Sequence, residues 1–166
     1  MGRPDVAVAI FRVPLLLWAR MIFQLRRRGA GKGESGAFLL GKEGGAAGRV
    51  TKFICYDDLD PQAFRSGAIT FHAGGYAALW ERCRREKIEV LADVHTHPGE
   101  SVQQSGIDRA HPMLPIVGHI ATILPNYAYT PWWSLETLGV YEYLGDFQWR
   151  TYAGPQKGQR IRLTLW

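Results

Sequence analysis

The pattern of apolar residues constrains the fold of this sequence more than any other feature, because these residues fall into short runs bounded by glycine, proline and polar residues. Runs of about four to eight apolar residues are typical of strands that are buried in a sheet. The run GAFLLG at residues 36–41 is the clearest example. We expect strands at residues 6–13, 36–41, 50–56, 69–72, 88–97, 115–124, 138–144 and 147–152.

Two segments between these runs carry apolar residues at helical spacing. Residues 14–29 begin with a proline, which suits the first turn of a helix, and end with Arg26–Arg28, which suits the carboxyl end of the helix dipole. Residues 75–87 place apolar side chains three or four positions apart. A short helical turn is also expected from Ser105 to Ala110.

The order of these elements predicts the fold class. Strands and helices alternate early in the chain, and a hairpin turn at Gly145–Asp146 joins two strands late in the chain. This order predicts an α/β (α+β) fold with a central mixed β-sheet flanked by helices, rather than a helical bundle or a β-sandwich. We expect a single domain over residues 1–154, with residues 155–166 as a C-terminal tail or an extra strand.

The composition and charge of the chain argue against two classes of partner, nucleic acids and membranes. The net charge is +5, but the basic residues are dispersed apart from two short runs, and no nucleic-acid-binding motif accompanies them. We therefore expect no nucleic-acid partner. The apolar stretch at residues 6–18 is interrupted by an arginine and a proline and is too short to span a bilayer, so no membrane partner is expected. Cys55 and Cys83 lack metal-site spacing, which predicts buried, reduced thiols in a cytoplasmic protein.

The residues that carry chemistry begin with His95 and His97, at the end of an expected strand. Alternate residues of a strand point to the same face, so the two imidazole rings can share a divalent metal such as zinc. Asp108 is the candidate third ligand, and Ser105 lies three positions before it on the same face of the expected helical turn. Three protein ligands and one open position are the composition of a catalytic zinc site, which also needs a carboxylate to accept a proton from water.

Two separate segments of the chain resemble the JAMM/MPN+ (Mov34/PAD-1) zinc metalloproteases. The family pattern runs HxHP, six residues, then SxxD, and this chain reads HTHP at residues 95–98 and SGID at residues 105–108. The family's upstream glutamate opens an ExxGxLxG strand, and here Glu34 opens ESGAFLLG, with Leu39 and Gly41 in register. The resemblance implies the MPN/JAB fold over most of the chain.

The resemblance also implies an activity, that of a JAMM-type zinc metallopeptidase. His95, His97 and Asp108 would bind one catalytic zinc ion, Glu34 would be the general base that activates water, and Ser105 would hydrogen-bond the oxyanion. Family members cleave peptide or isopeptide bonds after the C-terminal glycine tail of ubiquitin or a ubiquitin-like protein.

The chain is also similar to short, single-domain bacterial members of this family that are encoded in antiphage operons. The partners implied by this similarity are a ubiquitin-like protein or its conjugates, and ubiquitin-activating-like and conjugating-like enzymes of the same operon. The implied role is deconjugation or precursor processing in antiviral defence.

Two positions depart from the family pattern. Ala37 stands at the middle glycine of the family strand, and Ala92-Asp93 stands where many members have Gly-Trp. Neither departure removes a candidate ligand or the base. Asp93 shares the strand face of the two histidines, so it is a candidate for orienting a ligand ring, although a solvated carboxylate explains it equally well.

Other readings of the chain stay open. It could be a non-catalytic MPN scaffold or binding module for a ubiquitin-like protein, or a metallopeptidase that releases a sulfur-carrier protein. A zinc nucleoside deaminase is excluded because H-x-E and P-C-x-x-C are absent from the sequence. We expect His72, His111 and His119 to be structural, with His111 bordering the site, and Trp132-Trp133 to pack against the sheet.

Overall fold

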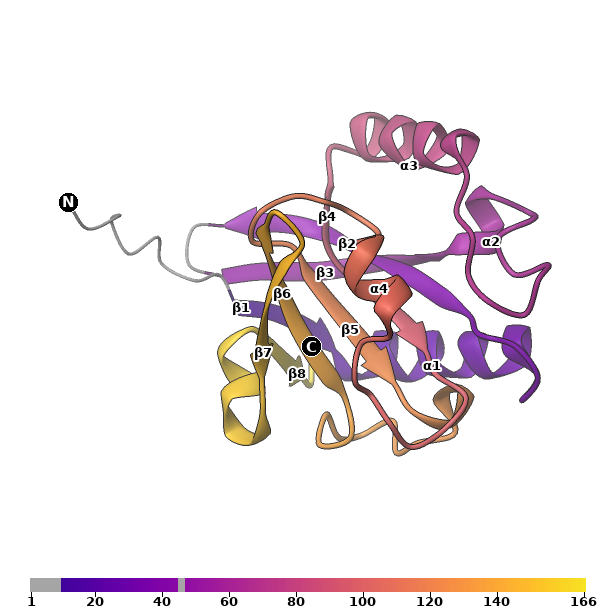
Figure 1. The fold of residues 1–166 in the computed structure, drawn as a ribbon. Helices are drawn as coiled ribbons and strands as arrows, with labels where there is room; N and C mark the ends of the chain where they lie inside the picture. The colour runs from indigo at the N-terminus through magenta and orange to yellow at the C-terminus, as the bar shows by residue number, and fades with distance from the viewer. Residues whose placement is uncertain (1–9, 45–46) are drawn as a thin grey trace.

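The computed structural model describes residues 10–44 and 47–166, whose strands form one sheet (Figure 1). Residues 6–9 of the first expected strand lie outside the described residues. The strands are β1 (Ile10–Pro14), β2 (Gly36–Gly44), β3 (Ala47–Cys55), β4 (Glu89–Thr96), β5 (Ile120–Leu124), β6 (Gly139–Gly145), β7 (Gln148–Tyr152) and β8 (Ile161–Thr164). The helices are α1 (Leu15–Gly29), α2 (Tyr56–Leu59), α3 (Ala73–Glu86) and α4 (Gly106–Ala110), with 3-10 turns η1 (Asn126–Ala128) and η2 (Gly154–Gln159).

The sheet is mixed, with the strand order β7-β6-β5-β4-β2-β3-β1-β8. Strand β4 runs parallel to β5, and β1 runs parallel to both β3 and β8. The remaining neighbours are antiparallel. The predicted mixed sheet flanked by helices is therefore confirmed. Because β4 and β5 are parallel and central, their carboxyl ends meet at one edge of the sheet, where the segments that follow them lie close together.

Helix α1 covers one face of the sheet (Figure 1). It begins directly after Pro14, as the sequence predicts, and it ends where Ala30 takes a left-handed conformation and donates its N–H to the Arg26 carbonyl. The buried side chains of α1 recur at helical spacing. They are Trp18, Met21, Ile22 and Leu25, and they pack with Leu39, Ala92 and Val94 of the sheet.

The opposite face of the sheet is covered by α2 and α3 (Figure 1). Leu79 and Cys83 of α3 pack against Phe38 and Leu40 of β2 in this second core. Cys83, like Cys55, is a buried free thiol, so the burial predicted for both cysteines is confirmed.

A bulge in β4 determines which of its side chains face α2 and α3. Leu39 of β2 pairs with Ala92, but Leu40 pairs with Val90, so Leu91 is the extra residue. Beyond the bulge, Phe38 pairs with Asp93. Since directly paired residues of a sheet point to the same side, Asp93 lies on the face that carries Phe38.

Gly36 is required at its position because of close packing. It pairs with His95, and a Cβ atom added to it would lie 2.3 Å from Cε2 of Tyr56. The neighbouring Ala37 is fully buried on the α1 side of the sheet, where its methyl group is accommodated. Gly36, one position before the middle glycine of the family strand, therefore leaves room for the ring of Tyr56.

Residues 69–72 do not form the strand that the sequence predicts. Two of their backbone donors are bound by the preceding segment instead: the N–H of Thr70 donates to the carbonyl of Ala63, and that of His72 donates to the carboxylate of Asp60. These tertiary contacts fix an extended segment that has no partner strand in the described sheet.

The β6–β7 hairpin forms as predicted, but its turn is shifted by one residue. The two central residues are Asp146 and Phe147, with φ of 49° and 58°, which is the pattern of a type I′ turn. Gly145 still pairs with Gln148, and the register shifts just before it. The expected Gly145–Asp146 turn is therefore wrong, because a bulge next to Gly145 moves the reversal along the chain.

Two further expectations concern the late part of the chain. Trp132 and Trp133 are 39% and 63% exposed and stack edge-on against each other, so the prediction that they pack against the sheet is wrong.

The segment predicted as a tail or an extra strand contains β8, which pairs with β1. The division at residue 154 stays a prediction. Among the residues that the structure describes, no helix is long and apolar enough to cross a bilayer.

Candidate metal centre

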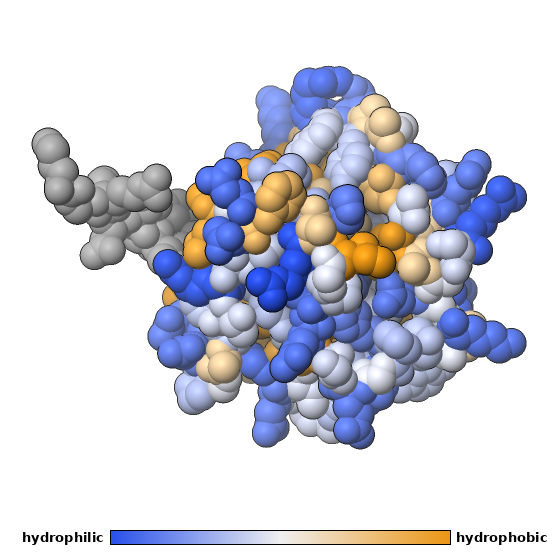
Figure 2. Space-filling model, viewed as in Figure 1, coloured by the Kyte–Doolittle hydropathy of each residue, from blue (hydrophilic) through white to orange (hydrophobic). Residues whose placement is uncertain are grey.

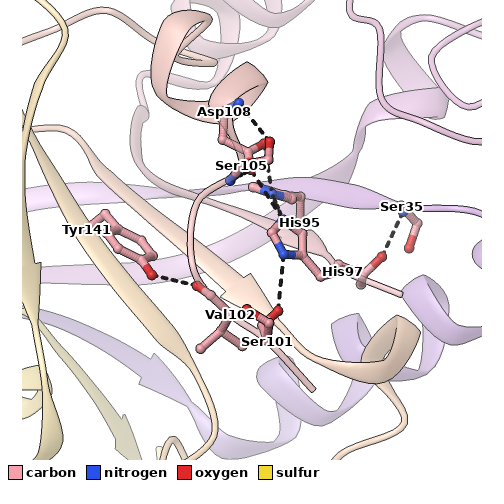
Figure 3. Close-up of polar contacts among 9 residues, drawn as sticks. Ser35, His95, His97, Ser101, Val102, Ser105, Asp108 and Tyr141 are labelled. Carbon is pink, nitrogen blue, oxygen red and sulfur yellow. Dashed lines mark hydrogen bonds and ion pairs between the residues drawn. The ribbon is translucent and has the colours of Figure 1, made fainter. Parts of the chain in front are cut away.

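Two histidines and an aspartate converge at the carboxyl end of β4 (Figure 3). His95 lies near the end of the strand and His97 follows it, two positions on, so their rings point to the same side. Asp108 comes from α4, which Ser105 caps. The N–H of Asp108 donates to Ser105 Oγ over 3.1 Å, and the N–H of Ser105 donates to Asp108 Oδ2 over 2.7 Å. This capping box holds the carboxylate toward the two rings.

The distances among these three side chains suit a shared metal ion. His95 Nε2 and His97 Nε2 are 3.1 Å apart. Asp108 lies 3.3 Å from each ring, through Oδ1 to His95 and through Oδ2 to His97. Ligands about 2.0–2.1 Å from a tetrahedral zinc ion are separated by roughly 3.3 Å. The nitrogen and oxygen donors of this set are also those that zinc prefers, so the residues fit a zinc ion with three protein ligands.

The ring of His97 is oriented by the loop that follows it. Its Nδ1 lies 3.2 Å from the carbonyl of Ser101, which accepts a hydrogen bond from the ring when Nδ1 is protonated. Protonation of Nδ1 leaves the lone pair of Nε2 directed at the site, which is the form of imidazole that binds metals. Both histidines are only 9% exposed, so the site is shielded from bulk water on the strand side.

The charges of the site are strongly coupled. Burial alone would raise the pKa of Asp108, but hydrogen bonds with His95 and His97 hold this pKa far below its usual range. The hydrogen bond with Asp108 in turn raises the pKa of His97, against the opposite effect of burial. The carboxylate is therefore ionised and attracts positive charge, whether a proton or a metal cation.

Glu34 lies at the entrance of β2 and lines the same cavity as His95 and Asp108. Burial raises the pKa of Glu34, while the nearby His95 and His97 lower it. The N–H of Ile69 donates to the Glu34 carboxylate, and the backbone N–H of Glu34 donates to Gly67. The sequence places Glu34 about sixty positions before the histidines, and the antiparallel pairing of β2 with β4 brings it beside them.

The cavity at this site has a volume of about 960 Å³. It is lined by Glu34, by residues 68–71, by α4 and by the β6–β7 hairpin. His111 also lines it, as the sequence predicts. Figure 2 shows apolar surface above α4 and over the hairpin, within an otherwise hydrophilic face. Ile107 and Phe147, which are 70% and 60% exposed, contribute apolar side chains at the rim.

Asp93 does not orient either metal-site histidine, which corrects one of the two sequence interpretations. Its Oδ2 lies 2.6 Å from Nε2 of His119, and both residues are buried. The solvated alternative is also wrong, because Asp93 is 1% exposed. His119 is structural, as expected. Its distance of 26 positions from Asp93 leaves no local signal for the pair in the sequence.

A second group with metal-ligand atoms consists of Cys55, Asp57 and Asp58. The guanidinium of Arg28 forms ion pairs with both aspartates. Burial raises the pKa of the Cys55 thiol to about 12, so the thiolate that a metal needs is strongly disfavoured. The cationic Arg28 therefore already balances the charge of the two carboxylates.

The turn that follows β5 is strained, and no pattern in the sequence predicts it. Asn126, Tyr127 and Ala128 have φ of 52°, 51° and 66°, and none of them is glycine. A left-handed conformation costs roughly 1–2 kcal/mol for each such residue, so the surroundings must hold the turn in place. Arg26 of α1, which the sequence assigns only to a helix end, donates to the carbonyls of Ala128 and Thr130.

Comparison with known proteins agrees with this fold. The solution structure of protein DSY2949 from Desulfitobacterium hafniense is similar in fold, with a TM-score of 0.61, 15% sequence identity and 93% of each chain covered. Residues 17–135, which are most of the chain and include all five candidate site residues, match the family described as prokaryotic homologs of the JAB domain. The chain therefore belongs to the JAB/MPN family, as one of its prokaryotic JAB-domain homologs.

Proposed function

We propose that this protein is a zinc-dependent metallopeptidase that cleaves after the C-terminal glycine tail of a ubiquitin-like protein. The observation that carries the proposal is the convergence of His95, His97 and Asp108 at distances of 3.1–3.3 Å. His95 and Asp108 line a cavity that also contains a half-buried carboxylate, Glu34. Three metal ligands without a nearby base would favour a structural metal site. A base without the ligands would favour neither a structural metal site nor a metallopeptidase.

Different residues of the chain have different roles in the proposed reaction. The two histidines and Asp108 would hold a zinc ion, which would supply Lewis acidity to lower the pKa of water to about 7 and to polarise the scissile carbonyl. Glu34 accepts a proton from the attacking water and returns it to the departing amine. The raised pKa of Glu34 suits both proton transfers. A carboxylate with a higher pKa is a stronger base toward water, and the carboxylic acid that forms is still acidic enough to protonate an amine.

Ser105 is suited to stabilise the oxyanion that forms at the carbonyl. Its Oγ accepts the N–H of Asp108, which orients the hydroxyl, and a hydroxyl that accepts a hydrogen bond can still donate its proton. Ser105 lines the cavity together with Glu34 and Asp108. A donor directed at developing negative charge contributes several kcal/mol in other hydrolases, roughly 2.7–4 kcal/mol per donor.

The surroundings of the metal centre support this substrate class. An extended tail with glycine at the cleavage point has no side chain to collide with residues 68–71 or with α4, which both line the cavity. The exposed Ile107 and Phe147 at the rim offer apolar surface to the folded body of the substrate. A ubiquitin-like protein, in which a compact body carries such a tail, matches both features.

The test combines metal content with cleavage. Protein purified without added metal is analysed for zinc, and about one ion per chain is expected. It is then given a ubiquitin-like domain whose Gly-Gly end is joined to a reporter, either through a peptide bond or through a lysine side chain. We expect chelator-sensitive cleavage of at least one linkage.

The Glu34→Gln variant separates the peptidase from a binding module. It should retain zinc but lose cleavage by at least a hundredfold, within the usual contribution of a general base. Glu43→Gln, at an exposed glutamate of β2, is the matched control and should cleave normally. Zinc-loaded wild-type protein that binds the substrate without cleaving it would overturn the peptidase assignment and favour a non-catalytic binder.

A further inference from the structure

We infer that Arg26 is a positioning residue for the metal ligand His97, and that it acts through the left-handed turn at residues 126–128. The inference rests on the proposed function, because it concerns the zinc affinity of the same centre. Arg26 lies on α1, on the far side of the sheet from α4 (Figure 1), and its hydrogen bonds go to the turn rather than to a candidate ligand. Its effect on the site must therefore pass through the backbone.

The first link joins Arg26 to the turn. Its Nε donates to the carbonyl of Ala128 over 2.6 Å, and a terminal nitrogen donates to the carbonyl of Thr130 over 2.5 Å. The guanidinium also lies 5.6 Å from the ring centroid of Tyr129. A planar guanidinium can satisfy two carbonyls in a fixed fork, which no other side chain reproduces. Three successive residues with positive φ are thereby held in a conformation that they would not adopt alone.

The second link joins the turn to His97. The N–H of Tyr127 donates to the carbonyl of His97 over 2.8 Å, and the N–H of His97 donates to Leu124, the last residue of β5, over 2.8 Å. His97 lies one residue beyond the end of β4. Both of these backbone bonds therefore come from β5 and the turn, and one of them depends on the left-handed conformation of Tyr127.

A third contact extends the effect to the ring of His97. The N–H of Asn126 donates to the carbonyl of Gly99 over 2.9 Å, which ties the turn to the loop between β4 and α4. The same loop contains Ser101, whose carbonyl faces Nδ1 of the His97 ring. The turn thus secures both the backbone of the ligand and the loop that orients its imidazole.

The consequence is that loss of Arg26 should loosen one ligand without removing any. Partners that orient metal ligands typically contribute about 10–100-fold to metal affinity. Arg26→Gln keeps a good helix former but cannot bridge both carbonyls. Arg27→Gln is the matched control, because Arg27 is the next residue of the same helix, is exposed and bonds only locally to Gln24 among the recorded contacts.

The experiment measures zinc affinity by competition with a chromophoric chelator, and the visible spectrum of the cobalt-substituted protein, for the wild type and both variants. We expect Arg26→Gln to bind zinc about 10–100-fold more weakly and to change the cobalt spectrum, while Arg27→Gln matches the wild type. Circular dichroism and thermal unfolding of the metal-free proteins verify that the fold is retained. A general loss of stability would not by itself alter the cobalt spectrum of the folded fraction.

Each outcome decides the inference. Wild-type affinity and spectrum in a folded Arg26→Gln protein would overturn it. If that variant does not fold, Arg26→Lys is measured instead, because an ammonium keeps the charge but lacks the fork, and an intermediate affinity is then expected. A wild-type protein that binds no metal at all would contradict the proposed function, and this result is distinct from equal binding by wild type and variant.

Discussion

The carboxylate of Asp93 lies 2.6 Å from Nε2 of His119, and the two side chains are 2% and 4% exposed. Asp93 lies on β4 two residues before His95 and lines the metal-site cavity, whereas His119 lines a second cavity of about 710 Å³ beside α3. The pair therefore forms part of the wall between the two cavities. The backbone carbonyl of Asp93 also accepts the hydroxyl of Thr122, which joins the pair to β5.

We predict strong coupling between Asp93 and His119. Removal of one member of a buried pair leaves the other without its partner and costs about 3–5 kcal/mol, whereas replacement of both by apolar residues costs much less. Asp93→Leu and His119→Leu should each destabilise the protein, and the double variant should be more stable than the sum of the two losses implies. Urea unfolding of the four proteins measures this. Additive losses would show that the two side chains do not act as a pair.

Asp108→Ala should abolish zinc binding together with cleavage. Two histidines remain, but the charge that attracts the cation is removed. The expected zinc content falls from about one ion per chain to near zero after dialysis against a weak chelator. Asp146→Ala, at the exposed hairpin turn, is the control and should keep its zinc. Full zinc content in Asp108→Ala would remove this residue from the ligand set.

Ser105→Ala should affect both the helix cap and the reaction, in separable ways. Loss of an N-cap side chain costs about 1 kcal/mol of stability, since the N–H of Asp108 then lacks its acceptor. Zinc should still bind, because Ser105 is not among the converging donor atoms. The turnover rate should fall more than the Michaelis constant changes, because an oxyanion donor acts on the transition state. A variant with a normal turnover rate would limit Ser105 to the structural cap.

The Asp60 carboxylate should make stability depend on pH. Burial opposes its ionisation, but hydrogen bonds from the backbone and ring of His72 and from the backbone of Gln62 lower the pKa of Asp60 below its ordinary value. A lowered pKa in the folded state means that the stabilisation is complete above the unfolded pKa of about 3.9 and is lost as pH falls below it. Thermal unfolding between pH 3 and pH 7 tests this.

In that experiment, Asp60→Asn supplies the comparison. The wild type should be more stable by about 1–3 kcal/mol above pH 5, and the difference should shrink as the pH falls through the folded pKa of Asp60. A difference that is constant over the whole range would mean that the charge of Asp60 contributes nothing beyond its hydrogen-bond geometry.

Gly36→Ala should destabilise the protein more than an ordinary surface substitution. The new Cβ would lie 2.3 Å from the Tyr56 ring and 2.8 Å from the carbonyl of Val94, which are impossible contacts. Relief requires movement of Tyr56 or of β4, at a cost of about 1–3 kcal/mol. Gly74→Ala in α3 is the control, since its Cβ would meet nothing within 4 Å and alanine favours a helix. Equal stability of the two variants would contradict the tight packing.

Much of the fold could be predicted because its signals are local. The helix after Pro14 follows from 3.6-residue spacing, and the short apolar runs mark most strands. The segment at residues 115–124 was predicted too long, since its first half forms turns before β5. The sequence of residues 69–72 suits an extended backbone and so predicts a strand, and only the contacts with Ala63 and Asp60 decide that no strand of the described sheet pairs with them.

The sequence by itself determined the identity, order and spacing of the candidate site residues. His95 and His97 share a side because strands alternate, and Ser105 and Asp108 cap a helix because they are three residues apart. Tertiary structure alone decided the rest. It brings Glu34 to the cavity through the pairing of β2 with β4, gives Asp93 a buried partner, exposes Trp133, and joins Arg26 to a turn 102 positions away. These relations depend on burial and close packing between distant segments, which no local pattern of residues specifies.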